Sequence, residues 1–163
     1  MRKSLLGIVG LMLTAASPAT LLTPTAIQSE IRSEGAKAVV NRLYNSGAYD
    51  KVVMSKIRSG NVQWILLARP LSAGTDAATS EGLTQALIYA LPKSPQAVLS
   101  VIDLSGSSYP RSPGEVCSAS FFEGAPTNIP AYRAAAVRSV KAVTVPSLQA
   151  AKQICLKRLR AKG

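Results

Sequence analysis

The clearest hydrophobic pattern in the chain lies between residues 81 and 91. Apolar side chains recur there at the spacing of one helix face, at Leu83, Ala86, Leu87, Ala90 and Leu91. The polar segment 72–80 before it contains several side chains able to cap a helix, and Pro92 follows it directly. The pattern therefore predicts a helix over 81–91.

Five further segments carry a helical row of apolar side chains. They are 29–45, 48–59, 62–68, 130–143 and 146–161. Gly60 fits the left-handed position that closes many helices, so it should end the second of these segments. The third contains Trp64-Ile65-Leu66-Leu67 and is apolar on all sides, which predicts the most buried element, ended or kinked by Pro70.

The apolar run 97–104 is ambiguous, because eight mostly apolar residues suit either a short helix or a buried strand. Ser94-Pro95 precedes it, with serine as an N-cap and proline at the first helical position. This start signal favours the helix.

A long irregular stretch, 105–128, is rich in glycine and proline. Loops of this length are usually functional, tethered or disordered. A disulfide from Cys117 to the last helix would tether it, and Phe121 and Phe122 could insert into the core.

Together these elements predict an all-α fold in one compact domain spanning 27–163. Six to seven short helices would form either an irregular bundle or a right-handed stack of helix pairs, without an internal repeat. The composition agrees, because alanine is abundant and aromatic residues make up only 5% of the chain.

The first nineteen residues have the pattern of a secretory signal peptide. Arg2 and Lys3 precede the apolar run 5–13, which is too short to span a bilayer, and small residues follow it. We expect cleavage after Ala19, with Ala16 and Ala26 as alternatives, and export to the periplasm or the medium. No second long apolar run follows, so no membrane span is expected in the mature chain.

Two cysteines, Cys117 and Cys155, lie too far apart in sequence for a CxxC motif. In an exported protein, two lone cysteines usually pair. The inner row of the last helix, Leu148, Ala151, Cys155 and Leu159, turns Cys155 inward and supports this pairing. Such a bond should stabilise the fold by about 4 kcal/mol.

The formal net charge is +11, of which Arg2 and Lys3 contribute two charges. Cations are dense near the C-terminus, which suggests contact with anionic lipid or a cell-wall polymer. The alternative is an ordinary solvated helix end, where cations favour the dipole. The candidate contacts are Lys152, Lys157, Arg158, Arg160 and Lys162.

The chain contains no histidine, which removes Ser-His and Cys-His nucleophiles and histidine-ligated metals. No nucleotide-binding or nucleophile-elbow motif occurs, so no catalytic residue, cofactor or metal is expected. Asp103, Glu115 and Glu123 could serve a carboxylate-dependent hydrolase, although they could equally be solvated or paired with Arg111.

These observations favour a non-catalytic protein-interaction module of the cell envelope, such as an adaptor, an inhibitor or an immunity-type partner. Tyr109, Phe121 and Phe122 are candidate contacts, because aromatic side chains often anchor interfaces. A basic protein that binds anionic lipid or cell-wall polymer is the second reading. Nucleic acid is not an expected ligand of an exported chain.

Overall fold

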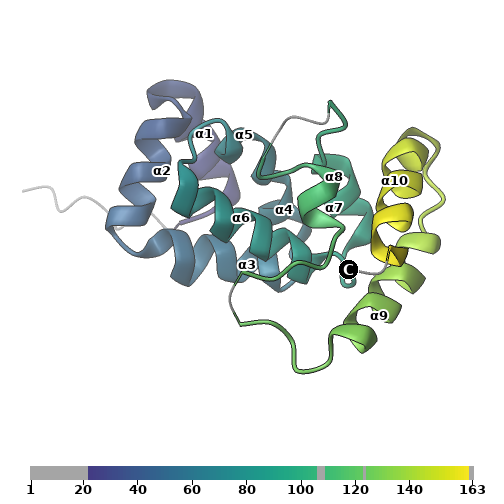
Figure 1. The fold of residues 1–163 in the computed structure, drawn as a ribbon. Helices are drawn as coiled ribbons and strands as arrows, with labels where there is room; N and C mark the ends of the chain where they lie inside the picture. Colours follow the sequence, from purple (N-terminus) through teal and green to yellow (C-terminus); the bar gives the residue numbers. More distant parts are fainter. Residues whose placement is uncertain (1–21, 106–108, 123, 162–163) are drawn as a thin grey trace, which may run out of the picture.

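The computed structural model describes residues 22–105, 109–122 and 124–161, and within these it contains helices and no strand (Figure 1). The all-α prediction is confirmed. The elements in chain order are α1 Pro24–Glu34, α2 Ala36–Asn45, the π-helical turn η1 Tyr49–Met54, α3 Ser55–Arg58, α4 Val62–Leu66, α5 Ala68–Ser72, α6 Ala77–Ala90, α7 Pro95–Val101, α8 Pro113–Val116, α9 Ile129–Lys141, the 3₁₀ turn η2 Pro146–Leu148 and α10 Gln149–Arg160.

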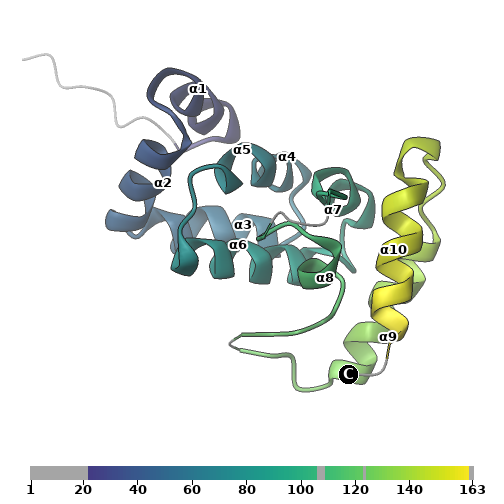
Figure 2. The same ribbon diagram turned by 45° about the horizontal axis from the view of Figure 1, so that its top comes forward.

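The helices form an irregular array with a hairpin at each end. The α1–α2 hairpin lies at one end and the α9–α10 hairpin at the other, with α6 between them (Figures 1 and 2). Helix α6 contacts α3, α5, α7 and α8, so neighbours surround most of it. The predicted signal peptide, residues 1–19, lies outside the described residues, and among those described no helix is long and apolar enough to span a bilayer.

Helix α6 matches its predicted apolar row, because Leu83, Ala86, Leu87, Ala90 and Leu91 are all fully buried. It begins earlier than expected, at Ala77, since Asp76 caps it. The Asp76 carboxylate accepts from the backbone N–H of Thr79, and the Thr79 hydroxyl accepts from the backbone N–H of Asp76. This reciprocal cap satisfies two backbone donors and fixes where the central helix starts.

Two predicted helices are broken into pairs, so the chain has more and shorter segments than the six to seven expected. The segment 29–45 is interrupted at Gly35. Its φ of 85° lies in the region that glycine adopts readily, and this residue ends α1. In 62–68 the break comes at Leu67, and Pro70 lies inside the first turn of α5 rather than ending a helix. Proline is tolerated there because a first-turn N–H has no intrahelical partner.

Helix α4 is not the most buried element, and that prediction is wrong. Trp64 and Ile65 are buried, but Val62 is 48% exposed and Leu66 is 45% exposed. The helix packs against α3, α5 and α7 and leaves its other face at the surface. An apolar circumference alone therefore did not indicate burial on every side.

The predicted helix 48–59 forms with one irregularity, a π-helical first turn. Its row Tyr49, Val53 and Ile57 is fully buried. Gly60, with φ of 88°, ends it as predicted: its N–H binds the Ile57 carbonyl, and the N–H of Asn61 binds that of Lys56.

The ambiguous run after Ser94-Pro95 is helical, as favoured, but only to Val101, and Ile102 is already extended. Ser94 occupies the N-cap position, yet its hydroxyl donates to the carbonyl of Gly60 instead of capping α7. This bond joins the start of α7 to the turn after α3.

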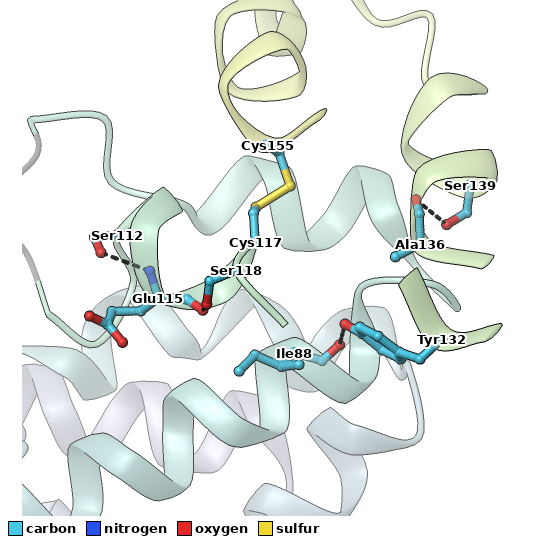
Figure 3. Close-up of a disulfide and its surroundings, with 9 residues drawn as sticks. All are labelled: Ile88, Ser112, Glu115, Cys117, Ser118, Tyr132, Ala136, Ser139 and Cys155. Atoms are coloured by element: carbon cyan, nitrogen blue, oxygen red, sulfur yellow. Dashed lines mark hydrogen bonds between the residues drawn. A yellow bond between two sulfur atoms is a disulfide. The ribbon is translucent and has the colours of Figure 1, made fainter. Parts of the chain in front are cut away.

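The long irregular stretch contains the short helix α8 and is held to the rest of the fold at several points. The Thr84 hydroxyl donates to the carbonyl of Pro110 at 2.9 Å, and the Asp103 N–H donates to the Arg111 carbonyl at 3.0 Å. Cys117, directly after α8, forms a disulfide with Cys155 of α10 (Figure 3), with Cα atoms 5.1 Å apart. The predicted pairing is confirmed, and it ties the stretch to the C-terminal hairpin.

Candidate functional site

A surface groove with a volume of about 700 Å³ runs between the η1–α3 segment and α6. We call it the α3–α6 groove. The described residues that line it are Tyr44, Asp50, Arg58, Ala78, Glu81, Gly82, Gln85, Tyr89, Lys93, Phe122 and Gly124.

The two walls of the groove run in the same direction along the chain. At one end, the buried Tyr49 hydroxyl donates to the Thr79 carbonyl at 2.6 Å. At the other end, the Lys93 ammonium donates to the Arg58 carbonyl at 2.7 Å. Helices α4 and α5 connect the end of the first wall to the start of the second. The residues of η1–α3 therefore lie beside the residues of α6 in the same order.

Two carboxylates line the beginning of the groove. Asp50 and Glu81 are both exposed, and neither forms an ion pair with another residue that the structure describes. Gly82, which follows Glu81, lies close to the other wall: a Cβ added to it would be 3.8 Å from Asp50 Oδ1. This end therefore presents uncompensated negative charge.

Two cations line the other end. The Arg58 guanidinium carbon lies 5.9 Å from the centre of the Tyr89 ring, within the range of a cation–π contact. The Lys93 ammonium uses one of its three donors on the Arg58 carbonyl. Both side chains thus retain donors for an anionic group.

Aromatic side chains line the groove between and beside the charges. Tyr44 is 48% exposed and Phe122 is 46% exposed. Phe122 is held in place through its backbone N–H, which donates to the Oε1 atom of the buried Gln85 at 3.1 Å. The Tyr89 hydroxyl donates to the carbonyl of Gly124, so α6 positions the segment that closes this side.

Phe121, beside Phe122, lies in an aromatic cluster and not in the groove. Its ring centre is 5.3 Å from that of Tyr89 and 5.1 Å from that of Tyr132, the latter edge to face. The Tyr132 hydroxyl donates to the Ile88 carbonyl at 2.7 Å (Figure 3), and burial raises the pKa of Tyr132. This cluster fixes the stretch after the disulfide against α6 and α9.

The three aromatic residues singled out from the sequence therefore separate. Only Phe122 lines the α3–α6 groove, and Phe121 is half-buried. Tyr109 is 43% exposed outside the groove lining, and partial burial raises the pKa of its hydroxyl. The carboxylates singled out from the sequence do not converge on one site either. An oxygen of Asp103 lies 3.8 Å from a guanidinium nitrogen of Arg111, and Glu115 belongs to the first turn of α8. Glu123 lies outside the described residues.

The C-terminal cations lie on the α9–α10 hairpin. Lys157, Arg158 and Arg160 are exposed, whereas the Lys152 ammonium donates to the Val143 carbonyl at 2.7 Å. Lys162 lies outside the described residues. Residues 129–161 contain seven lysines and arginines and no acid, whereas 22–128 contain nine cations and eight acids. The excess positive charge is thus concentrated on one hairpin.

Sequence reasoning missed most of the groove. Glu81, Gln85 and Tyr89 follow one another at the i, i+4, i+8 spacing on α6, so a polar row beside the apolar one was readable. The groove residues on η1–α3 could not be predicted in this way, because their place depends on two helices that run in parallel. No group of three acids or cysteines that could hold a metal occurs in the part of the chain that the structure describes. Comparison of the chain with protein-family models, with curated proteins and with solved structures finds no match.

Proposed function

We propose that the protein is a non-catalytic protein-interaction module of the cell envelope, and that the α3–α6 groove is its contact surface. The observation that carries this proposal is the composition of the groove. Exposed Tyr44 and Phe122 lie beside Tyr89 and charges of both signs, and aromatic and arginine side chains dominate binding energy at protein interfaces.

The chemistry of the chain supports recognition over catalysis. It contains no histidine, and both cysteines are joined in the disulfide, so the common nucleophile and base pairs are not available to the groove. The backbone of Phe122 is held at the groove by the hydrogen bond that its N–H donates to Gln85 Oε1. A surface ordered in this way loses little entropy on binding.

Capture from an envelope extract tests the proposal. The mature protein from Thr20 serves as bait at low and at physiological salt, beside two variants, Tyr44→Ala and Val62→Ala. Both positions are 48% exposed, but only Tyr44 lines the groove. We expect one stoichiometric protein partner at physiological salt, bound about tenfold more weakly by Tyr44→Ala and unchanged by Val62→Ala. Equal capture by the two variants would argue against the groove.

A second candidate function is the binding of anionic lipid or cell-wall polymer through the α9–α10 hairpin. It is favoured by the concentration of cations and the lack of any acid in residues 129–161. The test replaces Lys157, Arg158 and Arg160 by glutamine, with Lys37, Lys51 and Lys56 replaced in a control of equal charge. Binding to anionic vesicles or to isolated wall polymer should fall steeply with salt and only in the first variant.

Export through a cleaved signal peptide, to the periplasm or the medium, completes the proposal. Helix α1 starts at Pro24 and is capped by the Thr23 hydroxyl, which accepts from the N–H of Ala26. Cleavage after Ala19 leaves this helix and its cap whole, whereas cleavage after Ala26 removes the cap and the first three residues of the helix. This argues against cleavage after Ala26 and is compatible with Thr20 as the mature N-terminus.

A further inference from the structure

The α3–α6 groove carries opposite charges at its two ends, and we infer that its occupant is an extended peptide segment of the partner with a basic group at one end and a carboxylate at the other. The basic group lies at Asp50 and Glu81, and the carboxylate at Arg58 and Lys93. This inference rests on the proposed function and specifies the chemistry of the partner.

The charge separation follows from the parallel course of the two walls. Asp50 precedes Arg58 along η1–α3, and Glu81 precedes Lys93 along and just beyond α6. Because the walls run in the same direction, the two carboxylates fall at one end and the two cations at the other. Antiparallel walls with the same sequence would have placed each acid opposite a cation.

The helix dipole explains only part of this arrangement. A negative charge near a helix start and a positive charge near its end are favourable, which accounts for Asp50 and Arg58. The effect is confined to the first and last turns, however, and Glu81 is the fifth residue of α6, beyond its first turn. Glu81 also has no ion-pair partner among the described residues, so its charge at this end of the groove is open to a basic group of a ligand.

The length of the groove sets the length of the peptide. At the α-helical rise of 1.5 Å per residue, Glu81 is about 14 Å from Ala90, the last residue of α6, and Lys93 follows just beyond. An extended peptide advances about 3.3 Å per residue, so its two charged groups should be about four to six residues apart. Between them, the rings of Tyr89 and Phe122 offer contact to apolar side chains of the peptide.

Synthetic peptides with blocked ends test the inference by charge and by spacing. The probe is acetyl-Lys-Thr-Val-Thr-Val-Glu-amide. It is compared with a form that has lysine at both ends, a form that has glutamate at both ends, and a form in which lysine and glutamate are adjacent. Affinities are measured by fluorescence anisotropy at low salt. We expect the spaced lysine–glutamate peptide to bind more tightly than each of the others, by up to about fivefold, the upper end of the range for one exposed ion pair.

A charge reversal gives a readout that loss of folding cannot imitate. Glu81→Lys leaves Asp50 opposite the new lysine, so this end becomes neutral overall; the glutamate–glutamate peptide should gain affinity until it binds about as tightly as the spaced lysine–glutamate peptide. The matched pair Arg58→Glu and Lys56→Glu separates the groove from its surroundings, because both residues are exposed on α3 and only Arg58 lines the groove. Lys56→Glu should leave the ranking unchanged. Arg58→Glu leaves Lys93 opposite the new glutamate, so the lysine–lysine peptide should gain affinity until it binds about as tightly as the spaced lysine–glutamate peptide.

Equal affinities for the four peptides, an unchanged ranking in Glu81→Lys, or no binding of any peptide at about 1 mM, where even weak recognition is measurable, overturns the inference. None of these results bears on the capture experiment with Tyr44→Ala and Val62→Ala. A partner that still depends on Tyr44 would then retain the proposed function and show that the groove recognises it by other chemistry.

Discussion

The connection between α5 and α6 lies very close to the α1–α2 hairpin, and this predicts how much stability a larger residue at Gly74 would cost. Gly74 lies in this connection, and a Cβ added to it would lie 2.3 Å from the carbonyl carbon of Ala36, 2.4 Å from its oxygen and 2.5 Å from the nitrogen of Lys37. All three atoms belong to the backbone at the start of α2. Rotation of a side chain therefore cannot relieve the contact.

Gly74→Ala should force the α1–α2 hairpin away from α5 and α6. Overpacking in a well-packed core costs about 1–3 kcal/mol when side chains can adjust, and we expect at least the upper part of this range because backbone must move here. The control is Gly82→Ala. Its Cβ would have ordinary contacts of 3.6 Å and more, and it lies inside α6, so alanine should stabilise by about 0.5–1 kcal/mol.

Urea unfolding followed by far-UV circular dichroism measures both variants under the same oxidising conditions. The prediction is opposite shifts of the unfolding midpoint, with an unchanged slope for Gly82→Ala. If Gly74→Ala proves as stable as the parent, the hairpin does not pack against the α5–α6 connection as described. If Gly82→Ala is the more damaging change, the reasoning from glycine contacts is refuted.

Three further predictions concern the disulfide, a cap and the N-terminus. Cys155→Ser opens a loop of 38 residues and should cost about 4 kcal/mol without abolishing helix content, so an unchanged thermal midpoint under oxidising conditions contradicts it. Hydrogen bonds from the hydroxyl and N–H of Thr79 lower the pKa of Asp76. The stability that the ionised Asp76 cap gives the fold is therefore present above about pH 4 and lost as the pH falls further. In acid titrations, the difference in unfolding free energy between the parent and Asp76→Ala should shrink over that range. Mass spectrometry of the exported protein should give Thr20 as the first residue, and a chain starting at Ile27, which lacks the Thr23 cap, would contradict this.

Local signals predicted much of the fold from the sequence. The apolar row of α6 and the glycine after α3 depend on neighbouring residues only, and both were found where expected. The disulfide was also predictable, because the inner row of α10 turns Cys155 toward the core.

What was missed depends on contacts between distant segments. The break at Gly35 and the exposed face of α4 reflect how these helices pack, which a single helical row does not encode. The groove was missed for the same reason, since Asp50 and Glu81 line the same end of it only because the two walls run in parallel. Phe122 was recognised as an aromatic candidate, but its place in the groove depends on the hydrogen bond from its backbone to Gln85.

Site-specific photo-crosslinking tests the claim that the α3–α6 groove is the contact surface most directly. A photoreactive phenylalanine analogue is placed at position 44 or 122, and in controls at position 62 or 154, all of which are exposed. After irradiation in envelope extract at physiological salt, the same single protein should be linked to positions 44 and 122 and absent from 62 and 154. Products that are the same at all four positions, or that form mainly at position 154 on the basic hairpin, would contradict the account and favour the α9–α10 surface.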